Sequence, residues 1–192
     1  MIYFLRNSFF DYFCKRKFSK KVDNYRMIKL VPFEENDFEK LISWIDSEEL
    51  LVQFAGAVVF KYPLTKEQLA IYNSDDKRLA FKVVEIETRK TIGHAEIYLV
   101  NPEIVRLCRI LIGDKEYRGK GIGQQIIQQL RDYSFDKFNA GIVELNVYDW
   151  NISAIKCYEK VGFKINPNGT STTEVNGKIW TAINMRTSRT EK

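Results

Sequence analysis

The sequence predicts one α/β (α+β) domain built on a mixed, mostly antiparallel central sheet with helices on its faces. The first observation is a series of three apolar, strand-like runs at about 79–87, 91–100 and 104–112, joined by three-residue turns. Short turns between such runs favour an antiparallel meander. The second observation is that the pattern beyond the meander alternates helix, strand, helix and strand. At 192 residues the chain is long enough to bury one ordinary core.

The N-terminal half of the domain is expected to add a strand and helices. A strand is predicted at 27–31, and Asn36 can cap a helix that follows it. Residues 47–64 are irregular in pattern, although they are rich in aromatic and apolar side chains. Thr65 with Gln68 forms a capping-box pattern for another short helix. The first of these helices would bury an apolar face made of Phe38, Leu41, Ile42 and Ile45.

The C-terminal half contains a long helix, a strand and a short helix before its last strands. Residues 118–137 hold a glycine-rich loop and a helix, and a strand follows at 142–148. Ser153 is the expected N-cap of a short helix over 153–161, and Gly162 is the expected C′ residue. Another strand is predicted to start at Phe163.

The two ends of the chain differ from the domain, which is expected to span residues 27–186. Asn176-Gly177 predicts a two-residue hairpin turn near the C-terminus, and the polar tail at 187–192 is expected to fray. The extension at 1–26 alternates aromatic and polar side chains before a basic run. Three interpretations stay open for it: a membrane-surface helix, a helix docked on a hydrophobic surface, and an addition before an ancestral start at Met27.

The formal net charge of +5 is concentrated at the N-terminus. Residues 1–26 hold seven basic and two acidic residues, which leaves 23 of each sign in the rest of the chain. A neutral domain gives no support to nucleic-acid binding, which would have to depend on the N-terminal segment alone. No apolar run approaches the ~18 residues of a membrane span, and the N-terminus is not typical of a signal peptide.

The cysteines and the histidine of the sequence restrict the kinds of metal and catalytic site that the chain can form. Cys14, Cys108 and Cys157 fit no zinc spacing, and three cysteines cannot all pair within one chain, which suits a reducing, cytoplasmic location. His94 is the single histidine, so a histidine-based triad and a multi-histidine metal site are excluded. A strand histidine beside Gly93 is expected to be structural. No metal is therefore expected.

The strongest functional signal is the stretch Tyr117-Arg118-Gly119-Lys120-Gly121-Ile122-Gly123. It links an apolar strand-like run, Ile110-Leu111-Ile112, to a helix whose buried face is predicted to hold Ile122, Ile126, Leu130 and Tyr133. The first N–H groups of a helix have no partner within it, and the helix dipole adds positive charge there. Glycines let those groups approach a ligand closely. The stretch predicts a phosphate or pyrophosphate pocket; the alternative is a basic turn that only caps the helix.

Two better-known phosphate loops do not fit this stretch. A P-loop requires four residues between its first glycine and Gly-Lys-Ser/Thr. Here five residues separate Gly113 from Gly119, and Gly121 stands where a hydroxyl is required. A dinucleotide fingerprint requires a third glycine three positions after the second, and that position holds Gln124.

A second constellation follows the 142–148 strand. Asn151 lies in the loop where that strand ends, and ligands bind at such loops on half-open α/β sheets. Ala154 and Tyr158 are four residues apart, so they share a helical face. Ala154 leaves room for another group, and Tyr158 would bring a phenol to the same place. The alternative for Tyr158 is a half-buried packing residue.

Together the two motifs resemble the acetyl-CoA signature of the GCN5-related N-acetyltransferases. Arg118-x-x-Gly121-x-Gly123 is similar to the pyrophosphate motif of that family. The string Asn151…Ala154…Tyr158…Gly162-Phe163 is similar to the second half of its signature. The resemblance covers residues 27–186 and is closest to the branch of ribosomal-protein N-terminal and spermidine acetyltransferases. It implies acetyl-CoA as cosubstrate, no metal, and a V-shaped cofactor cleft between the central strands.

The resemblance also implies roles for single residues. Backbone groups of Ile110 and Ile112, on either side of Leu111, would pair with the pantetheine arm like an added strand. Asn151 would contact the pantetheine amides, and Tyr158 would protonate the departing thiolate. A phenol titrates near 10 and a thiol near 8.5, so Tyr158 holds a proton that it can give at neutral pH. The pyrophosphate would be held by the backbone N–H groups of Arg118, Gly119, Lys120, Gly121, Ile122 and Gly123, and Ala154 completes the cofactor-binding set.

The acceptor side is less fully specified by the resemblance. Many members of the family carry an acidic residue three places before Ile110, and that place holds Leu107 here. Glu96 is the candidate general base, with a solvated strand glutamate as the alternative. Holding the amine and the thioester together would supply much of the rate without a dedicated base. The candidates for the acceptor wall, with core packing as their alternative, are Trp44, Phe54, Phe60 and Tyr62.

The predicted function is therefore an acetyl-CoA-dependent N-acetyltransferase. Direct transfer to a primary amine of a small molecule or protein N-terminus is expected, because the motifs place no cysteine as a covalent carrier. The alternative is a catalytically impaired acyl-CoA-binding module. The expected partner is the amine acceptor rather than nucleic acid or a membrane, and a homodimer stays open.

Overall fold

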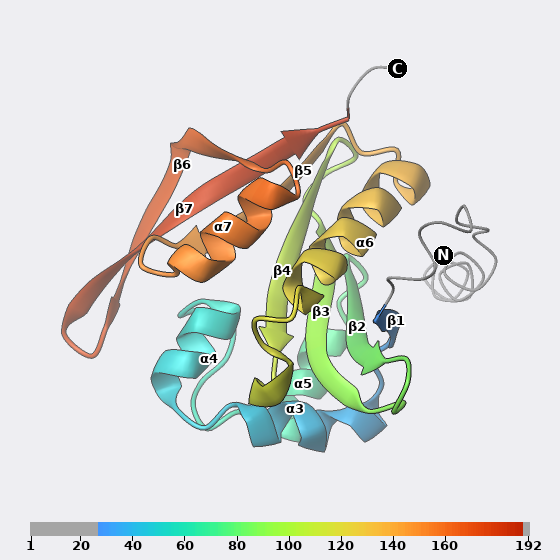
Figure 1. Cartoon of the computed structure of the whole chain (residues 1–192). Coiled ribbons are helices and arrows are strands. Elements are labelled where there is room, and N and C mark those ends of the chain that lie inside the picture. The colour runs from blue at the N-terminus through green and yellow to red at the C-terminus, as the bar shows by residue number, and fades with distance from the viewer. Residues whose placement is uncertain (1–26, 190–192) are drawn as a thin grey trace.

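The computed structural model of the chain describes residues 27–189, so the N-terminal extension and the interpretations offered for it lie outside the described part. Within that part, a seven-stranded sheet has the order β1-β2-β3-β4-β5-β7-β6 (Figure 1). Its central pair, β4 and β5, is parallel, and the other neighbouring strands are antiparallel. The predicted mixed, mostly antiparallel sheet is confirmed. The strands are β1 (Ile28–Pro32), β2 (Arg78–Glu85), β3 (Thr91–Leu99), β4 (Ile104–Ile112), β5 (Ile142–Tyr148), β6 (Lys164–Val175) and β7 (Lys178–Ser188).

The sheet opens between its two parallel strands. β4 and β5 pair only along Ile104–Leu107 and Ile142–Leu145. Beyond that point β4 stays beside β3, and β5 stays beside β7 as far as Tyr148. In Figure 1 the two strands lie together at the top and diverge downward. The opening is therefore formed by the backbone: β4 stays paired with β3 and β5 stays paired with β7, while β4 and β5 stop pairing with each other.

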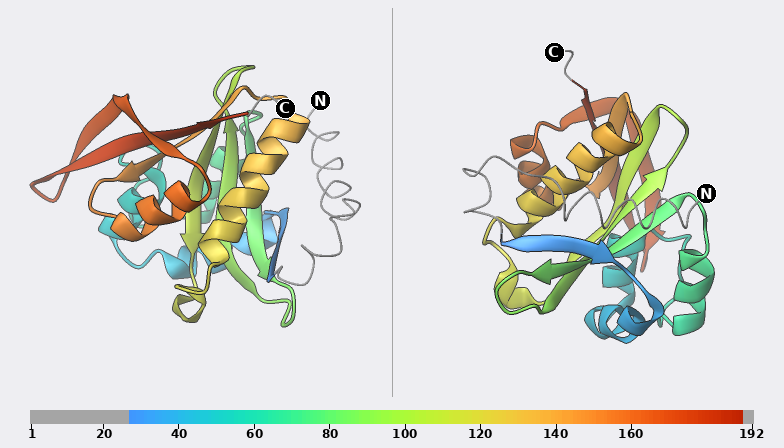
Figure 2. Two further views of the ribbon diagram at one scale, coloured as in Figure 1. Left: turned by 45° about the horizontal axis from the view of Figure 1, so that its top comes forward. Right: turned by 90° about the vertical axis from the view of Figure 1, so that its right-hand side faces the viewer.

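One face of the sheet is covered by α6 (Ile122–Lys137) (Figure 2). Its four predicted core residues, Ile122, Ile126, Leu130 and Tyr133, are all buried. They belong to the main hydrophobic core together with sheet residues from β2 to β5. Burying an apolar side chain of this size contributes roughly 1.5–3 kcal/mol, so α6 is firmly fixed to the sheet and its N-terminus has a defined place beside β4.

The opposite face is covered by three shorter helices, which have a core of their own. These are α3 (Phe38–Trp44), α4 (Glu48–Ala55) and α5 (Lys66–Asn73). Figure 2 shows them on the side of the sheet away from α6. The shared core of these helices contains Phe38, Leu41, Leu51, Phe54 and Leu69.

The start of the first helix differs from the sequence prediction. Asn36 does not cap α3, because it lies inside the short 3₁₀ helix η1 (Glu35–Asp37) that precedes it. The Asp37 carboxylate accepts a hydrogen bond from the Glu34 N–H at 2.9 Å and closes that turn instead. The buried face of α3 is nevertheless close to the prediction, since Phe38 and Leu41 are buried there.

The segment 47–64 was expected to be irregular, and that expectation is wrong for its first half. Ser47 caps α4 by accepting the Leu50 N–H at 3.2 Å. The helix is only eight residues long, too short for a clear period, but it explains the apolar content of the segment. Thr65 caps α5 as predicted.

The start of α7 (Ile152–Lys160) also differs from the prediction. Ser153 is not the cap, because the helix begins one residue before it. Asn151 is the cap, and its Oδ1 accepts the Ala154 N–H at 3.3 Å. The helix ends as predicted at Gly162, which has φ of 97° and donates its N–H to the Glu159 carbonyl at 2.9 Å.

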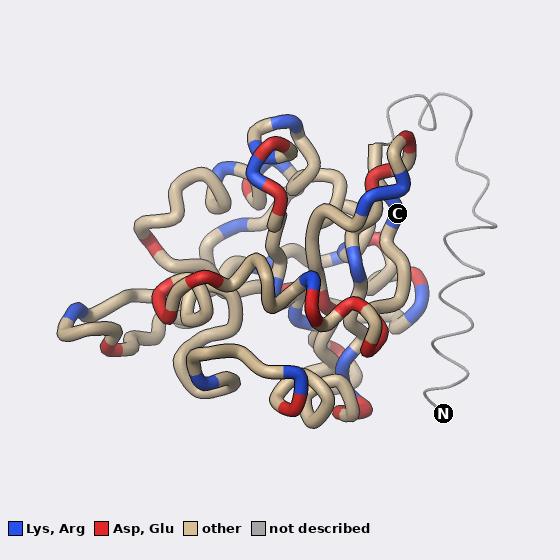
Figure 3. Tube along the Cα trace, turned by 90° about the horizontal axis from the view of Figure 1, so that it is seen from below, with Lys and Arg blue, Asp and Glu red and all other residues tan. Residues whose placement is uncertain are grey.

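The last two strands form a hairpin at the predicted turn. Asn176 and Gly177 have φ of 49° and 73°, as a two-residue primed turn requires. β7 extends to Ser188, so Thr187 and Ser188 pair with β5. Basic and acidic positions are interspersed along the described trace (Figure 3). Within residues 27–189, no helix has the length and apolar character needed to cross a membrane.

Candidate active site

A cavity of about 560 Å³ lies in the opening between β4 and β5. It is bounded by both strands, by α4 and the loop after it, by α7 and by the β6–β7 hairpin. This is the V-shaped cleft that the sequence predicts. Strand β4 contributes residues 106–111 to the lining, and Asn151 and Tyr158 line it from the side of α7.

The inner edge of β4 presents backbone groups to this opening. The Gly113 N–H donates to the Ile92 carbonyl on β3 at 2.9 Å, and Gly93 faces Ile112 in the ladder. Because backbone groups alternate along an antiparallel strand, the Ile112 N–H and carbonyl point away from β3. In the described chain no strand pairs with that edge beyond Leu107. The Ile112 carbonyl accepts a hydrogen bond from Arg118 Nε at 2.9 Å, which leaves the N–H directed at the opening.

A bulge in β4 shapes the floor of the cavity. Glu96 faces Cys108 and His94 faces Leu111, so two β4 residues, Arg109 and Ile110, oppose one residue of β3. Arg109 has φ of 48°, a left-handed conformation that non-glycine residues rarely adopt. In a regular strand Arg109 would point away from the face of Cys108. The bulge brings its guanidinium to the same face, where it meets Glu96.

The glycine-rich loop lies between β4 and the N-terminus of α6. Gly119 and Gly121 have φ of 76° and 80°, and a Cβ at either position would meet no heavy atom within 4 Å. Gly121 is the N-cap of α6, with no side-chain cap on the first N–H groups. The loop is therefore an open cradle of backbone donors at the positive end of a 16-residue helix. Lys120 is exposed and lies over the Tyr117 ring, 5.5 Å from its centroid.

The remaining loop residues tie this cradle to the core and to α7. Ile122, the first residue of α6, is buried in the main core. Gly123 faces α7, where an added Cβ would lie 3.5 Å from Cys157 Sγ. Ala154 and Ile155 of α7 pack against the main core from the other side. The two predicted motifs are thus carried by adjacent elements.

Tyr158 and Asn151 are brought to the cavity by α7. Tyr158 is partly buried against the main core, and its ring lies 6.4 Å from the Phe163 ring. Burial raises the pKa of its phenol, and the neighbouring Cys157 adds to this effect. The hydroxyl therefore holds its proton throughout the neutral range. Asn151 lines the same cavity while its Oδ1 caps the helix.

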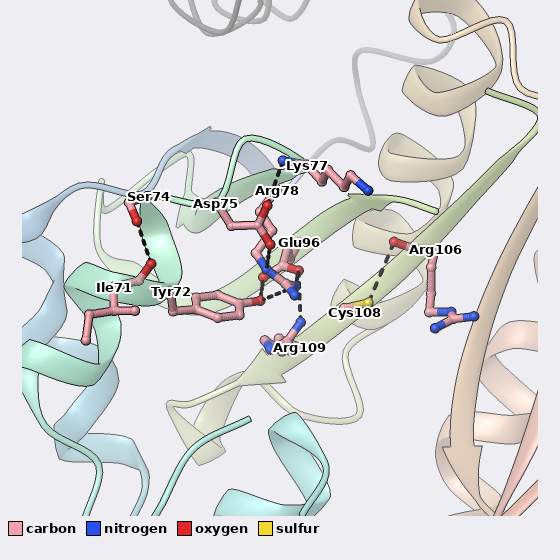
Figure 4. Close-up of polar contacts among 10 residues, drawn as sticks. All are labelled: Ile71, Tyr72, Ser74, Asp75, Lys77, Arg78, Glu96, Arg106, Cys108 and Arg109. Atoms are coloured by element: carbon pink, nitrogen blue, oxygen red, sulfur yellow. Dashed lines mark hydrogen bonds and ion pairs between the residues drawn. The ribbon is translucent and has the colours of Figure 1, made fainter. Parts of the chain in front are cut away.

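Glu96 is not the solvated strand glutamate of the alternative interpretation, because its side chain is 0% exposed. Arg78 Nη1 and Arg109 Nη1 each lie 2.9 Å from its Oε1, and the Tyr72 hydroxyl donates to its Oε2 (Figure 4). Burial raises the pKa of Glu96 to about 8, although Arg109 opposes the shift. Its carboxylate is enclosed by these partners and does not line the cavity.

Leu107 and His94 both have structural environments. Leu107 is buried in the main core, where it faces Ile97 on one neighbouring strand. His94 is buried, donates from Nδ1 to the Arg109 carbonyl at 2.9 Å, and contacts Phe33 edge to face. Burial lowers the pKa of His94 to about 4, so the ring is neutral at physiological pH.

The predicted aromatic wall is only partly present. Phe54 lines the cavity, whereas Phe60 packs on Tyr72 in the core of the short helices. Trp44 donates from Nε1 to Asp114 at 2.8 Å, and Tyr62 is exposed and bonds the Asp46 carbonyl. These three are not lining residues of the cavity.

Several lining residues were missed by sequence reasoning. They come from the strands of the meander and share the face that carries Glu96: Arg78, Tyr98, Arg106, Cys108 and Arg109. Strand alternation in Glu96-x-Tyr98 and Arg106-x-Cys108 could have indicated a polar face here. The position of Arg109 could not have been found in that way, because the bulge interrupts the alternation.

Comparison with known proteins identifies relatives of this arrangement. Residues 34–163 match the family model described as the acetyltransferase (GNAT) family. An N-acetyltransferase 9-like protein of Caenorhabditis briggsae is 25% identical over 146 residues, which cover 70% of this chain and 73% of that protein. A probable spermine N(1)-acetyltransferase of Bacillus subtilis subsp. natto is 32% identical over 53 residues, covering 28% and 35% of the two chains.

Solved structures share the fold. The crystal structure of spermidine N-acetyltransferase from Vibrio cholerae in complex with CoA and spermine superposes with a TM-score of 0.71. The sequence identity is 21%, and the alignment covers 84% of this chain and 95% of that chain.

Proposed function

The chain belongs to the acetyltransferase (GNAT) family and is an N-acetyltransferase that uses acetyl-CoA; we propose that it transfers the acetyl group directly to a primary amine in the cavity between β4 and β5. The observation that carries this proposal is that Tyr158, Asn151 and the unpaired edge of β4 meet at one cavity. The glycine-rich loop does not line this cavity, but it adjoins α7 through Gly123 and Cys157, which supports a cofactor that extends from the loop into the cavity.

The residues of the loop fit the pyrophosphate of acetyl-CoA. Gly119 and Gly121 leave open space around backbone donors, and the helix end behind them favours an anion. Arg118 and Lys120 are exposed beside these donors. Lys120 can supply a full charge, while Arg118 is engaged with the Ile112 carbonyl and fixes the loop to the end of β4.

The pantetheine arm is held by β4 and α7 in this proposal. The Ile112 N–H and the backbone of Ile110 pair with it as an added strand would. Leu111 contributes to the wall of the cavity, and Ala154 leaves room on the face of α7. Asn151 uses Oδ1 for the helix cap, so its Nδ2 group is the donor that remains for a pantetheine amide.

Tyr158 acts as the general acid. The amine nitrogen attacks the thioester carbonyl carbon, the carbon–sulfur bond breaks, and the phenol gives its proton to the departing sulfur. A phenol with a raised pKa keeps its proton until that charge develops. The second motif supports this role, because Tyr158 lies among the lining residues and Cys157 is directed at Gly123 instead.

No enclosed base is required in this mechanism. Glu96 is held away from the cavity surface by two arginines, so it is a positioning residue for them rather than a direct proton acceptor. The amine attacks as the free base, its nitrogen then loses a proton to water, and the Tyr158 phenolate recovers a proton from water. Positioning of amine and thioester then supplies the main acceleration.

The test is incubation of the full chain with acetyl-CoA and a broad panel of amines, with release of free thiol as the readout. Release that depends on an amine supports transfer. Tight acetyl-CoA binding without release from any amine would favour the alternative, a catalytically impaired acyl-CoA-binding module. The free thiols of Cys108 and Cys157 support the cytoplasm as the place of action. A homodimer would be checked by light scattering.

A further inference from the structure

The cavity is lined by arginine and by no acidic side chain of the described chain. Arg78, Arg106 and Arg109 reach its surface, whereas aspartate and glutamate are absent from its lining in residues 27–189. The carboxylates that pair with these arginines come from Asp75, Glu96 and Glu144, all outside the lining. The surface that an acceptor meets therefore presents guanidinium donors and no carboxylate, with the balancing carboxylates behind it.

Arg78 and Arg109 form a rigid pair on the cavity floor. Both share one oxygen of Glu96, and both guanidinium groups lie over the Tyr72 ring, each Cζ being 4.4 Å from its centroid (Figure 4). Tyr98 adds a second ring under Arg78 at 4.5 Å. Side chains fixed in this way lose little conformational freedom when they bind a ligand.

This pair has binding capacity that the protein does not use. The Arg109 side chain is 8% exposed, and its Nε is buried without a hydrogen-bond partner in the described part of the chain. Buried polar groups of native proteins are ordinarily paired. Burial and, after it, the charge of Arg109 lower the pKa of Arg78, as expected for two crowded cations. Glu96 offsets this repulsion from one side, and a second anion on the cavity side would offset it further and add hydrogen bonds.

We propose that the acceptor is an amine that also carries a carboxylate, and that Arg109 and Arg78 bind this carboxylate while the amine faces the thioester beside Tyr158. The inference depends on the proposed function, because it assigns the acceptor of that reaction. A carboxylate fits the planar donor fork of arginine. The neighbours of known structure are described as spermidine acetyltransferases, but a polyamine carries only positive charges, and this lining offers no carboxylate to pair with them.

Matched pairs of acceptors test the proposal. Each small aminocarboxylate is compared with its own carboxamide, and spermidine is included, with thiol release from acetyl-CoA as the readout. The amide has the less basic amine, so chemistry alone favours it. We expect kcat/KM to be about 10- to 100-fold higher for the carboxylate, the range of a hydrogen bond to a charged group. Peptides with and without an acidic side chain near the N-terminus show whether the carboxylate belongs to a free amino acid or to a peptide.

Variants connect this preference to the pair. Arg109→Gln should reduce the carboxylate-to-amide ratio toward one. In assays above about pH 8, where Glu96 is charged, Glu96→Gln should increase the ratio by removing the competing negative charge. Arg186→Gln is the matched control, since Arg186 pairs with Glu144 and does not line the cavity. If Arg109→Gln does not fold because Glu96 loses a partner, the double variant with Glu96→Gln restores the balance of charge and gives the same readout.

The outcomes separate the two proposals. Preference for aminocarboxylates or acidic peptides, reduced by Arg109→Gln, supports the inference. Equal rates for acid and amide, a preference for spermidine, or a ratio unchanged in Arg109→Gln would each overturn it while leaving the transfer reaction intact. The absence of thiol release from every amine would contradict the transfer reaction and this inference with it.

Discussion

Tyr158 has two neighbours that define what its hydroxyl can do. The ring packs against the main core, and the residue lines the cavity on the side of α7. Burial raises the pKa of the phenol, so a proton is available to the departing sulfur throughout the neutral range. Cys157, next in the chain, turns toward Gly123 instead. Cys157 therefore packs between α7 and α6, while Tyr158 is left to face the cavity.

Tyr158→Phe tests this role because it keeps the ring and removes the proton. Turnover should fall by roughly 10²–10⁴-fold, the usual scale of general acid catalysis, with little change in acetyl-CoA affinity. Steady-state rates and a thermal melt check this. Near-normal pre-steady-state thiol release would contradict the general-acid role, and a large loss of thermal stability would indicate a packing role.

Gly121→Val should weaken acetyl-CoA binding. A Cβ meets no protein atom at this position, so the loss would come from the ligand side and from the positive φ of 80°. Gly177→Val is the matched control, because Gly177 has φ of 73° and equally open surroundings at a distant hairpin. Calorimetry should show weaker binding only for the Gly121 variant. Equal affinities in the two variants would remove the loop from the cofactor site.

His94 should make the stability of the protein depend on pH in the acidic range. Its pKa is lowered by burial to about 4 in the fold, so the unfolded chain binds a proton more readily between about 6.5 and 4. Stability is therefore fully present above about pH 6.5 and falls as the pH drops toward 4, by about 3 kcal/mol in total. Arg109 opposes protonation of the ring and Asp37 favours it.

Urea unfolding of the native chain and of His94→Gln between pH 4 and 7 measures this contribution. The variant has no group that titrates at this position, so the difference between the two curves should shrink as the pH falls. Parallel curves over the whole range would show that His94 does not couple folding to protonation.

Among single residues, sequence reasoning proposed those whose local pattern is typical of a binding or catalytic site. The glycine loop, Asn151 and Tyr158 were identified because helix ends and helical spacing are local properties. Arg78 and Arg109 were missed, since they meet only through strand pairing across β2, β3 and β4. Glu96 was found as a candidate base, but its enclosure by arginines depends on the same pairing.

At the scale of elements, α7 combines a cap and a proposed binding group in one residue. Asn151→Ala should destabilise the protein by about 1 kcal/mol through loss of the cap and should also weaken acetyl-CoA binding. Asn151→Asp keeps a good capping oxygen but removes the Nδ2 donor, so it should lower only the affinity. Lys156→Ala is the control, because Lys156 is exposed on the same helix and does not cap it. Denaturant melts and calorimetry on the three variants check this, and unchanged affinity in Asn151→Asp would exclude the amide contact.

Element boundaries were predictable where a cap or turn is written locally, as at Thr65, Gly162 and Asn176-Gly177. They were not predictable for α4, whose eight residues show no clear period, or for α7, where two capping residues compete. Asn151 prevails over Ser153 because β5 ends at Tyr148 and leaves Asn151 as the last residue before the chain turns helical.

At the scale of the whole molecule, the sequence predicts the strands and the α-helices other than α4 in the correct order. The opening of the sheet depends in addition on which strands stop pairing. β5 leaves β4 after Leu145 because it continues beside β7. The β5 residues that pair with β7 lie about 40 residues earlier in the chain than their partners, and no local sequence pattern indicates this pairing. The resemblance to a known family supplied the cleft that residue patterns alone could not.

The unpaired inner edge of β4 should affect how fast its amide hydrogens exchange with solvent. Amide hydrogens in the middle of a sheet are ordinarily the slowest to be replaced by deuterium, because their protection follows the stability of the core. Here the Ile112 amide belongs to a central strand but lacks a strand partner on its side. It should therefore exchange quickly in the free enzyme, while the Leu111 amide beside it stays protected. Acetyl-CoA should slow the exchange of Ile112 to the pace of its neighbour, so that the middle of the sheet becomes fully protected only while the enzyme is charged for reaction.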